Sequence, residues 1–98
     1  MKGPLLLAAV LGAAAFSATS QEAGRYIAAP CAICHGTDGR AVTRDVIALA
    51  GLPRDHIVSQ MQAFRDAKRP ATVMHQIAKG YSDEQIAQLA AYFAAQKR

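Results

Sequence analysis

This sequence lacks tryptophan, has few aromatic residues and cysteines, and shows no strong excess of one charge. The chain has 98 residues, with two cysteines, no tryptophan and 6% aromatic residues. Its 11 lysines and arginines against 7 acidic residues give a formal net charge of +4. This excess is too small and too scattered to indicate nucleic-acid binding, and no basic tract with interleaved aromatic residues supports it. The length allows one small domain.

The sequence also lacks a hydrophobic run long enough to cross a bilayer, but it carries a shorter one at its start. Met1 and Lys2 precede an apolar run of 12 residues, Leu5 to Phe16, and a short polar tail. A membrane-spanning helix needs about 20 such residues, so the pattern predicts a secretory signal peptide. Small residues, Ala18 and Ser20, occupy the −3 and −1 positions of a cleavage site. We therefore predict a signal peptide over residues 1–20 and a mature domain over residues 21–98, periplasmic and without membrane insertion.

The mature chain is short, and its own hydrophobic core is expected to be too small for stable folding. It buries only about 60–65% of its unfolded surface, too little for a self-sufficient core. Cys31 and Cys34 lie three positions apart, and a disulfide between them would close too small a loop to constrain the chain. We expect a cofactor to complete the core.

Helix-like periodicity without strand alternation predicts an all-α fold of three to four helices. The predicted helices cover residues 22–34, 54–67, 71–79 and 83–95. Pro30 could kink or end the first of them. The glycine-containing stretch over residues 36–53 is predicted to be a loop, and a loop of this length in a small domain usually wraps around something.

The last two predicted helices have marked ends. Lys79 and Gly80 are typical of a helix C-terminus, a basic last turn followed by a glycine. Ser82 and Gln85 form a capping box, which predicts the start of the final helix. Tyr81 and Ile86 flank this start as a hydrophobic staple.

Residues 31–35 form the motif that indicates which cofactor the chain binds. Cys31-Ala32-Ile33-Cys34-His35 is a C-x-x-C-H sequence, the attachment signature of covalent c-type haem. Two thiols three residues apart can each add to one vinyl group of the haem, and the next residue then places its imidazole under the iron. The export signal agrees with this interpretation, because c-type cytochromes mature outside the bacterial inner membrane.

Three other interpretations of the two cysteines fit less well. A thioredoxin-like redox pair needs a βαβ context that this chain does not offer. A zinc site would need His56 or His75 to join the two cysteines and His35 at irregular spacings. A structural disulfide explains neither His35 nor the long loop.

The sixth ligand of the iron decides between electron transfer and binding of small molecules. Met61 and Met74 are the thioethers of the mature chain. Met61 repeats with Ile57 and Phe64 on one helical face, which favours a core position. Met74 opens a short helix 39 residues after His35, far enough for the chain to return on the other face of the haem, and is the favoured distal ligand. Adjacent residues on a helix point about 100° apart, so His75 cannot face the iron together with Met74, and we expect it at the surface or on the propionate side.

At these residues the chain resembles the class I cytochromes c. The haem-attachment helix of that family and the turn after it match CAICHGTDG. The proximal loop resembles VIALAG. The distal methionine segment and the C-terminal helix resemble RPATVMHQIAKGYSDEQIAQLAAYF. The resemblance implies a small cytochrome c fold around one covalent haem c. Cys31 and Cys34 would carry the thioethers, with His35 as proximal and Met74 as distal ligand. Many relatives have a proline whose carbonyl accepts a hydrogen bond from the histidine ligand. Ile47 stands in that place and could offer its own carbonyl.

Within that family, MHQIAKGYSDEQI is most similar to the cytochrome subunit of flavocytochrome c sulfide dehydrogenases. This resemblance implies an electron-accepting haem subunit beside a flavoprotein, with FAD on the partner chain only and no catalysis by this chain itself. The alternative is a free-standing electron shuttle between periplasmic or membrane redox enzymes. In a third hypothesis Met74 dissociates so that a small molecule reaches the iron. We expect an apolar shell around the haem, formed by Ile27, Ile47, Leu49, Leu52, Phe64, Ile77, Leu89, Tyr92 and Phe93.

Overall fold

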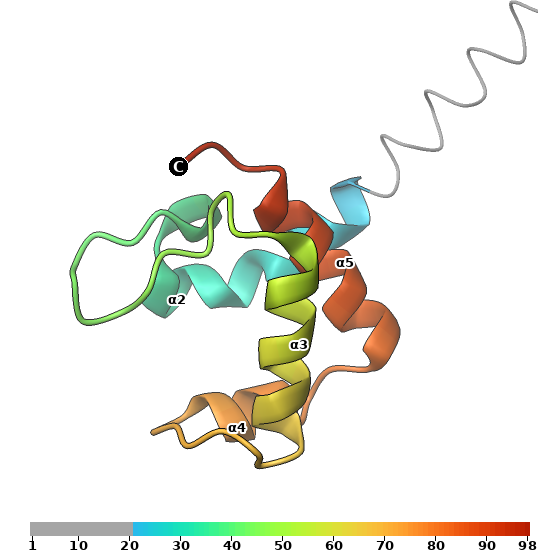
Figure 1. Ribbon diagram of the computed structural model, residues 1–98. Helices are drawn as coiled ribbons and strands as arrows, with labels where there is room; N and C mark the ends of the chain where they lie inside the picture. Colours follow the sequence, from blue (N-terminus) through green and yellow to red (C-terminus); the bar gives the residue numbers. More distant parts are fainter. Residues whose placement is uncertain (1–20) are drawn as a thin grey trace, which may run out of the picture.

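The computed structural model describes residues 21–98, which fold into short helices joined by loops, with no strand in this range (Figure 1). The predicted all-α class is thus confirmed. The predicted signal peptide lies entirely in residues 1–20, outside the described part. Among the described residues, no helix has both the length and the apolar character needed to cross a membrane.

The first predicted helix is divided into three pieces at Pro30. A helix over residues 21–28 is followed by the 3-10 turn η1 (Ala29–Cys31), with proline in its first positions, and by α2 (Ala32–His35). Proline has no N–H to donate and its ring clashes with the preceding turn, so a regular helix cannot continue through it. The break leaves the C-x-x-C-H residues on a short separate turn.

The loop after α2 contains a further 3-10 turn, η2 (Thr37–Gly39), and returns to the body of the protein at residues 49–51. The carbonyl of Gly39 accepts from the backbone N–H groups of Leu49 and Ala50, at 2.8 and 3.1 Å. Gly39 has a φ of 79°, and a Cβ there would lie 2.8 Å from Phe93 Cδ1. Glycine is therefore needed where the loop packs on the C-terminal helix.

α3 (Arg54–Arg65) begins after Pro53 and ends two residues before the predicted boundary. Lys68 N–H bonds to Ala63 O at 2.8 Å, and Ala67 N–H bonds to Phe64 O at 3.2 Å. This is the Schellman pattern, with Ala67 in the left-handed position at a φ of 57°. No sequence pattern indicates this motif, because glycine usually occupies the left-handed position.

α4 (Met74–Ala78) is shorter than the predicted helix over residues 71–79. The β-branched Thr72 and Val73 lose side-chain freedom in a helix and do not favour an earlier start. The end also differs from the prediction, since Gly80 does not have a positive φ. The helix closes instead through turn bonds, of which Gly80 N–H to Ile77 O measures 3.1 Å.

α5 (Asp83–Ala94) starts as predicted. Ser82 Oγ accepts from the Gln85 N–H at 3.1 Å, and Gln85 Oε1 accepts from the Ser82 N–H at 3.0 Å, so both bonds of the capping box are formed. Ile86 is fully buried and Tyr81 packs against the same core, as the staple predicts.

α3 lies at the centre and packs against both α4 and α5 (Figure 1). The helix over residues 21–28 crosses α5 at Gly24, where a Cβ would lie 2.7 Å from Gln88 O and 3.1 Å from Tyr92 Cβ. Within residues 21–98 the buried apolar core is small, and four of its nine members are alanines. These residues are Ala28, Ala50, Ile57, Met61, Ala78, Ile86, Leu89, Ala90 and Phe93.

Candidate haem site

The two cysteines of the C-x-x-C-H sequence lie on consecutive short turns. Cys31 ends η1 and is half-buried, whereas Cys34 lies in α2 and is exposed. Both are free thiols. Burial raises the pKa of the Cys31 thiol above its ordinary value. The structure thus leaves both sulfur atoms available for thioether formation.

His35 ends α2, and its ring is held by the proximal loop. His35 Nδ1 donates to the carbonyl oxygen of Ile47 across 2.8 Å. The donated proton fixes the tautomer in which Nε2 is unprotonated and can bind a metal. The expectation that Ile47 could replace the family's proline as acceptor is therefore met in the geometry.

The two methionines of residues 21–98 differ in their surroundings. Met61 is only 7% exposed and belongs to the core on α3, as the helical repeat predicts. Met74 is half-buried at the first position of α4. Ile77, three residues later, lies on the same helical face as Met74. Of the two thioethers, Met74 is the one outside the buried core.

His75 and His56 are in different environments. His56 is exposed. His75 is half-buried, and its buried Nδ1 has no hydrogen-bond partner within the described part of the chain. Among residues 21–98, no three His, Cys, Asp or Glu side chains are grouped so as to hold a metal ion, so the zinc arrangement is not formed there.

Apolar side chains flank both candidate axial ligands. Ile47, beside His35, is 58% exposed, and Val73 and Ile77, beside Met74, are 52% and 42% exposed. The residues predicted to form the apolar shell differ in how deeply they are buried. Leu89 and Phe93 lie in the protein core, Ile47 and Ile77 are exposed, and the others pack partly buried against the core; these are Ile27, Leu49, Leu52, Phe64 and Tyr92.

A polar cluster that the sequence did not predict ties the motif segment to the C-terminus. The Tyr92 hydroxyl donates to Asp38 Oδ1, and Arg40 forms an ion pair with Asp38 Oδ2 at 3.3 Å. Arg40 Nε also donates to the carbonyl of Lys97 at 2.9 Å. The hydrogen bond from Tyr92, and then Arg40, hold the pKa of Asp38 below its usual value, and the same hydrogen bond raises the pKa of Tyr92. Partners 54 positions apart leave no pattern in the sequence that could have revealed them.

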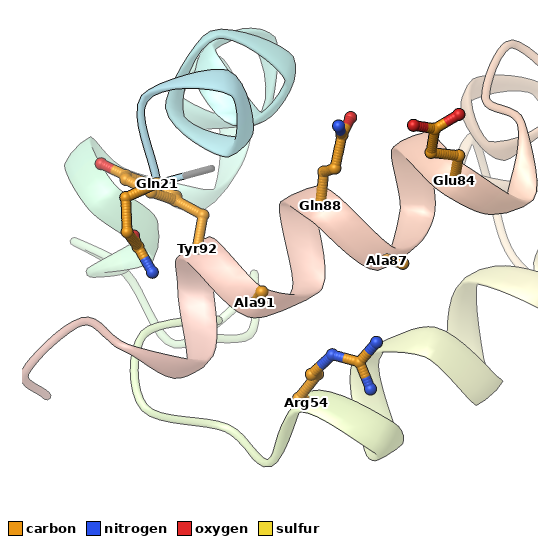
Figure 2. A pocket seen from close by; sticks show the side chains of 7 residues that line it. All are labelled: Gln21, Arg54, Glu84, Ala87, Gln88, Ala91 and Tyr92. Carbon is orange, nitrogen blue, oxygen red and sulfur yellow. The ribbon is translucent and has the colours of Figure 1, made fainter. Parts of the chain in front are cut away.

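Two surface concavities lie apart from the candidate ligands. One, of about 250 Å³, lies between the start of α3, one side of α5 and Gln21, and Figure 2 shows Arg54 and Glu84 on its walls. A second, of about 280 Å³, lies between the loop after α2 and Arg98. Neither contains Cys31, Cys34, His35 or Met74.

Comparison with known proteins gives the family. The chain is 36% identical over 98 aligned residues to the cytochrome subunit of sulfide dehydrogenase from Chlorobaculum tepidum, covering 92% of this chain and 88% of that protein. It is 38% identical over 93 residues to cytochrome c4 of Pseudomonas aeruginosa, covering 95% of this chain and 46% of that protein. No family model matches the chain.

A solved structure agrees with these relatives. The chain superimposes on cytochrome c4 of Acidithiobacillus ferrooxidans with a TM-score of 0.64 and 35% identity, over 66% of this chain and 37% of that one. The chain thus spans less than half the length of either cytochrome c4. It belongs to the class I cytochromes c, has a small cytochrome c fold, and its cofactor is covalently bound haem c.

The residues present fit that cofactor. The donor set comprises two free thiols, an imidazole with Nε2 available and a methionine outside the buried core. The unpartnered Nδ1 of His75 agrees with a site whose polar groups belong in part to the cofactor.

Proposed function

We propose that this chain is the electron-accepting haem subunit of a flavin-dependent sulfide dehydrogenase. The observation that carries the proposal is the alignment with the sulfide dehydrogenase cytochrome subunit, which runs through 92% of this chain and 88% of that one. The alignment thus relates nearly all residues of this chain to nearly all residues of that subunit, which supports the proposal.

The proposed attachment uses residues of the C-x-x-C-H sequence. Cys31 and Cys34 would form the two thioethers, and His35 Nε2 would bind the iron. The Ile47 carbonyl keeps the imidazole in one tautomer and one orientation through the 2.8 Å bond to Nδ1. When bound, haem c supplies an iron that takes up and releases one electron at a time.

Met74 is the proposed distal ligand. Its thioether would favour ferrous iron, raise the reduction potential and leave the iron without an open position for substrates. No side chain of this chain then needs to act as acid, base or nucleophile. Sulfide oxidation belongs to the FAD-containing partner, and this chain receives the electrons and passes them to another redox protein.

The proposed location is the periplasm. The signal peptide over residues 1–20, cleaved after Ser20, would deliver residues 21–98 to the compartment in which haem is attached to C-x-x-C-H sequences. The sulfide dehydrogenase partner would be exported to the same compartment.

The test is purification from native cells, first at low and then at high salt, with haem and flavin assayed in every fraction. We expect haem and flavin to elute together in one complex whose haem is reduced when sulfide is added. The isolated haem chain mixed with sulfide is the control, because sulfide reduces some haem proteins without an enzyme. Reduction must be faster in the complex than in this control.

The opposite result has a definite meaning. A haem chain that elutes without flavin at both salt concentrations, and that a sulfide-fed flavoprotein fraction does not reduce, would contradict the subunit assignment. The protein would then act as a free-standing electron shuttle.

A further inference from the structure

The first residue of the proposed mature chain is a glutamine in an unusual setting. Cleavage after Ser20 would make Gln21 the amino-terminal residue. Gln21 is exposed and lies at one end of the concavity between α3 and α5, close to Tyr92 in Figure 2. It therefore stands at the surface, where both its new amine and its side chain can react.

The helix over residues 21–28 holds this residue in a defined place. Gly24, one turn later, is buried in contact with α5 at Gln88 and Tyr92. Residues three apart share a helical face, and Gln21 lines the concavity together with the same two α5 residues. The amino terminus would thus rest against α5.

From this placement we propose that Gln21 is a modification site at which the mature chain is closed by a pyroglutamate ring, an inference that rests on the signal cleavage in the proposed function. The α-amine attacks Cδ of the Gln21 side chain. The N–Cδ bond forms, the Cδ–Nε2 bond breaks, and one amine proton moves to the departing nitrogen, which leaves as ammonia. No oxidant, reductant or co-substrate is required.

The chemistry favours this reaction at Gln21. Nucleophile and amide carbon belong to one residue, and such intramolecular reactions gain greatly from proximity. An α-amine titrates at about 7.7–8.0, so a substantial fraction is uncharged and nucleophilic near neutral pH.

The experiment is the intact mass of the haem-loaded protein, produced from the full-length sequence with its own leader in a bacterium that exports and assembles c-type cytochromes. We expect a mass lower by one ammonia than that of residues 21–98 with haem c. Amino-terminal sequencing should be blocked until pyroglutamyl aminopeptidase removes the ring.

Two variants serve as matched controls. Gln21→Ala cannot cyclise and should give an open, sequenceable terminus. Gln21→Glu should remain largely open under the same conditions, because a carboxylate is a much poorer electrophile than an amide. Both variants should keep the haem spectrum of the parent, since Gln21 does not belong to the proposed ligand set.

The experiment distinguishes failure of the cyclisation of Gln21 from failure of the cleavage after Ser20. An open amine on Gln21 after prolonged incubation at mildly alkaline pH would overturn the modification and leave the cleavage site intact. A chain that begins at any other residue would overturn both. Neither of these results would contradict the proposed electron-transfer role, which the sulfide experiment tests.

Discussion

Met74 is the residue whose replacement tests the proposed iron ligation most directly. In Met74→Ala we expect haem attachment to persist, because both thioether positions are intact. The reduction potential should fall by on the order of 0.1 V, a fraction of the roughly 0.8 V range that axial ligands span. The sulfur-to-iron charge-transfer absorption should disappear. Redox titration and visible spectroscopy measure both effects.

Met61 provides the matched control for that experiment. Its side chain is 7% exposed in the core, and Met61→Leu conserves the buried volume, at a cost below about 1.5 kcal/mol. The spectrum of this variant should equal that of the parent. If Met74→Ala kept the parent spectrum instead, Met61 or His75 would be the ligand.

Asp38 makes a pH-dependent contribution to stability through its contacts with Tyr92 and Arg40. Its folded-state pKa lies below the ordinary value of 3.8, so at low pH the unfolded chain binds more protons than the folded one. The stabilisation is therefore present above about pH 4 and lost as the pH falls through the lowered pKa. For Tyr92, whose pKa is raised above 10.0, the contribution is present below pH 10 and lost at higher pH.

Asp38→Asn tests this assignment without adding strain, because asparagine also tolerates the left-handed φ of 55° at this position. We expect the variant to be less stable than the parent at neutral pH and the difference to shrink below pH 4. Tyr92→Phe should show the same convergence. Denaturant titrations across this pH range give the comparison. A difference independent of pH would show that the carboxylate is not part of the stabilising contact.

At the scale of elements, the capping box sets the start of α5. Ser82→Ala removes the acceptor of the Gln85 N–H, which lies 3.1 Å away. Loss of such a cap typically costs about 1 kcal/mol of the free energy of unfolding. Ser59→Ala is the control, since this exposed hydroxyl inside α3 bonds only to the His56 carbonyl. The control should stay within about 0.5 kcal/mol of the parent, and equal losses for both variants would show that the cap has no special role.

The crossing of the first helix over α5 depends on the absence of a side chain at Gly24. In Gly24→Val, the Cβ would lie 2.7 Å from the backbone oxygen of Gln88, so the two helices must move apart. Overpacking of this kind costs typically about 1–3 kcal/mol. Gly80→Ala is the control, because a Cβ there meets Ile77 O at an ordinary 3.4 Å. Thermal unfolding of the haem-loaded variants should separate the two; a stable Gly24→Val would show that this crossing is not tight.

For the whole molecule, the small core makes folding dependent on the cofactor. In the described part of the chain, the buried apolar residues other than alanine number five: Ile57, Met61, Ile86, Leu89 and Phe93. In the double variant Cys31→Ala, Cys34→Ala we therefore expect no covalent haem and the loss of most cooperative folding. Haem staining after denaturing electrophoresis and circular dichroism measure the two effects. A cooperatively unfolding apoprotein would contradict this dependence.

The local parts of the structure could be predicted from the sequence. The all-α class, the capping box at Ser82, the core position of Met61 and the disruption at Pro30 follow from interactions among residues a few positions apart. Such short-range rules depend on backbone geometry that neighbours share. The C-x-x-C-H sequence is equally local, and so the cofactor could be predicted from the sequence without knowledge of the fold.

Contacts between distant residues were decided only in the tertiary structure. The bond from His35 to the Ile47 carbonyl depends on how the loop after α2 returns, and the Asp38–Tyr92 contact depends on the packing of the motif segment beside α5. The end of α3 at a left-handed Ala67 also departs from sequence preference. In each case the free energy of packing between elements exceeds the small local preferences of the backbone, which are typically below about 1 kcal/mol per residue.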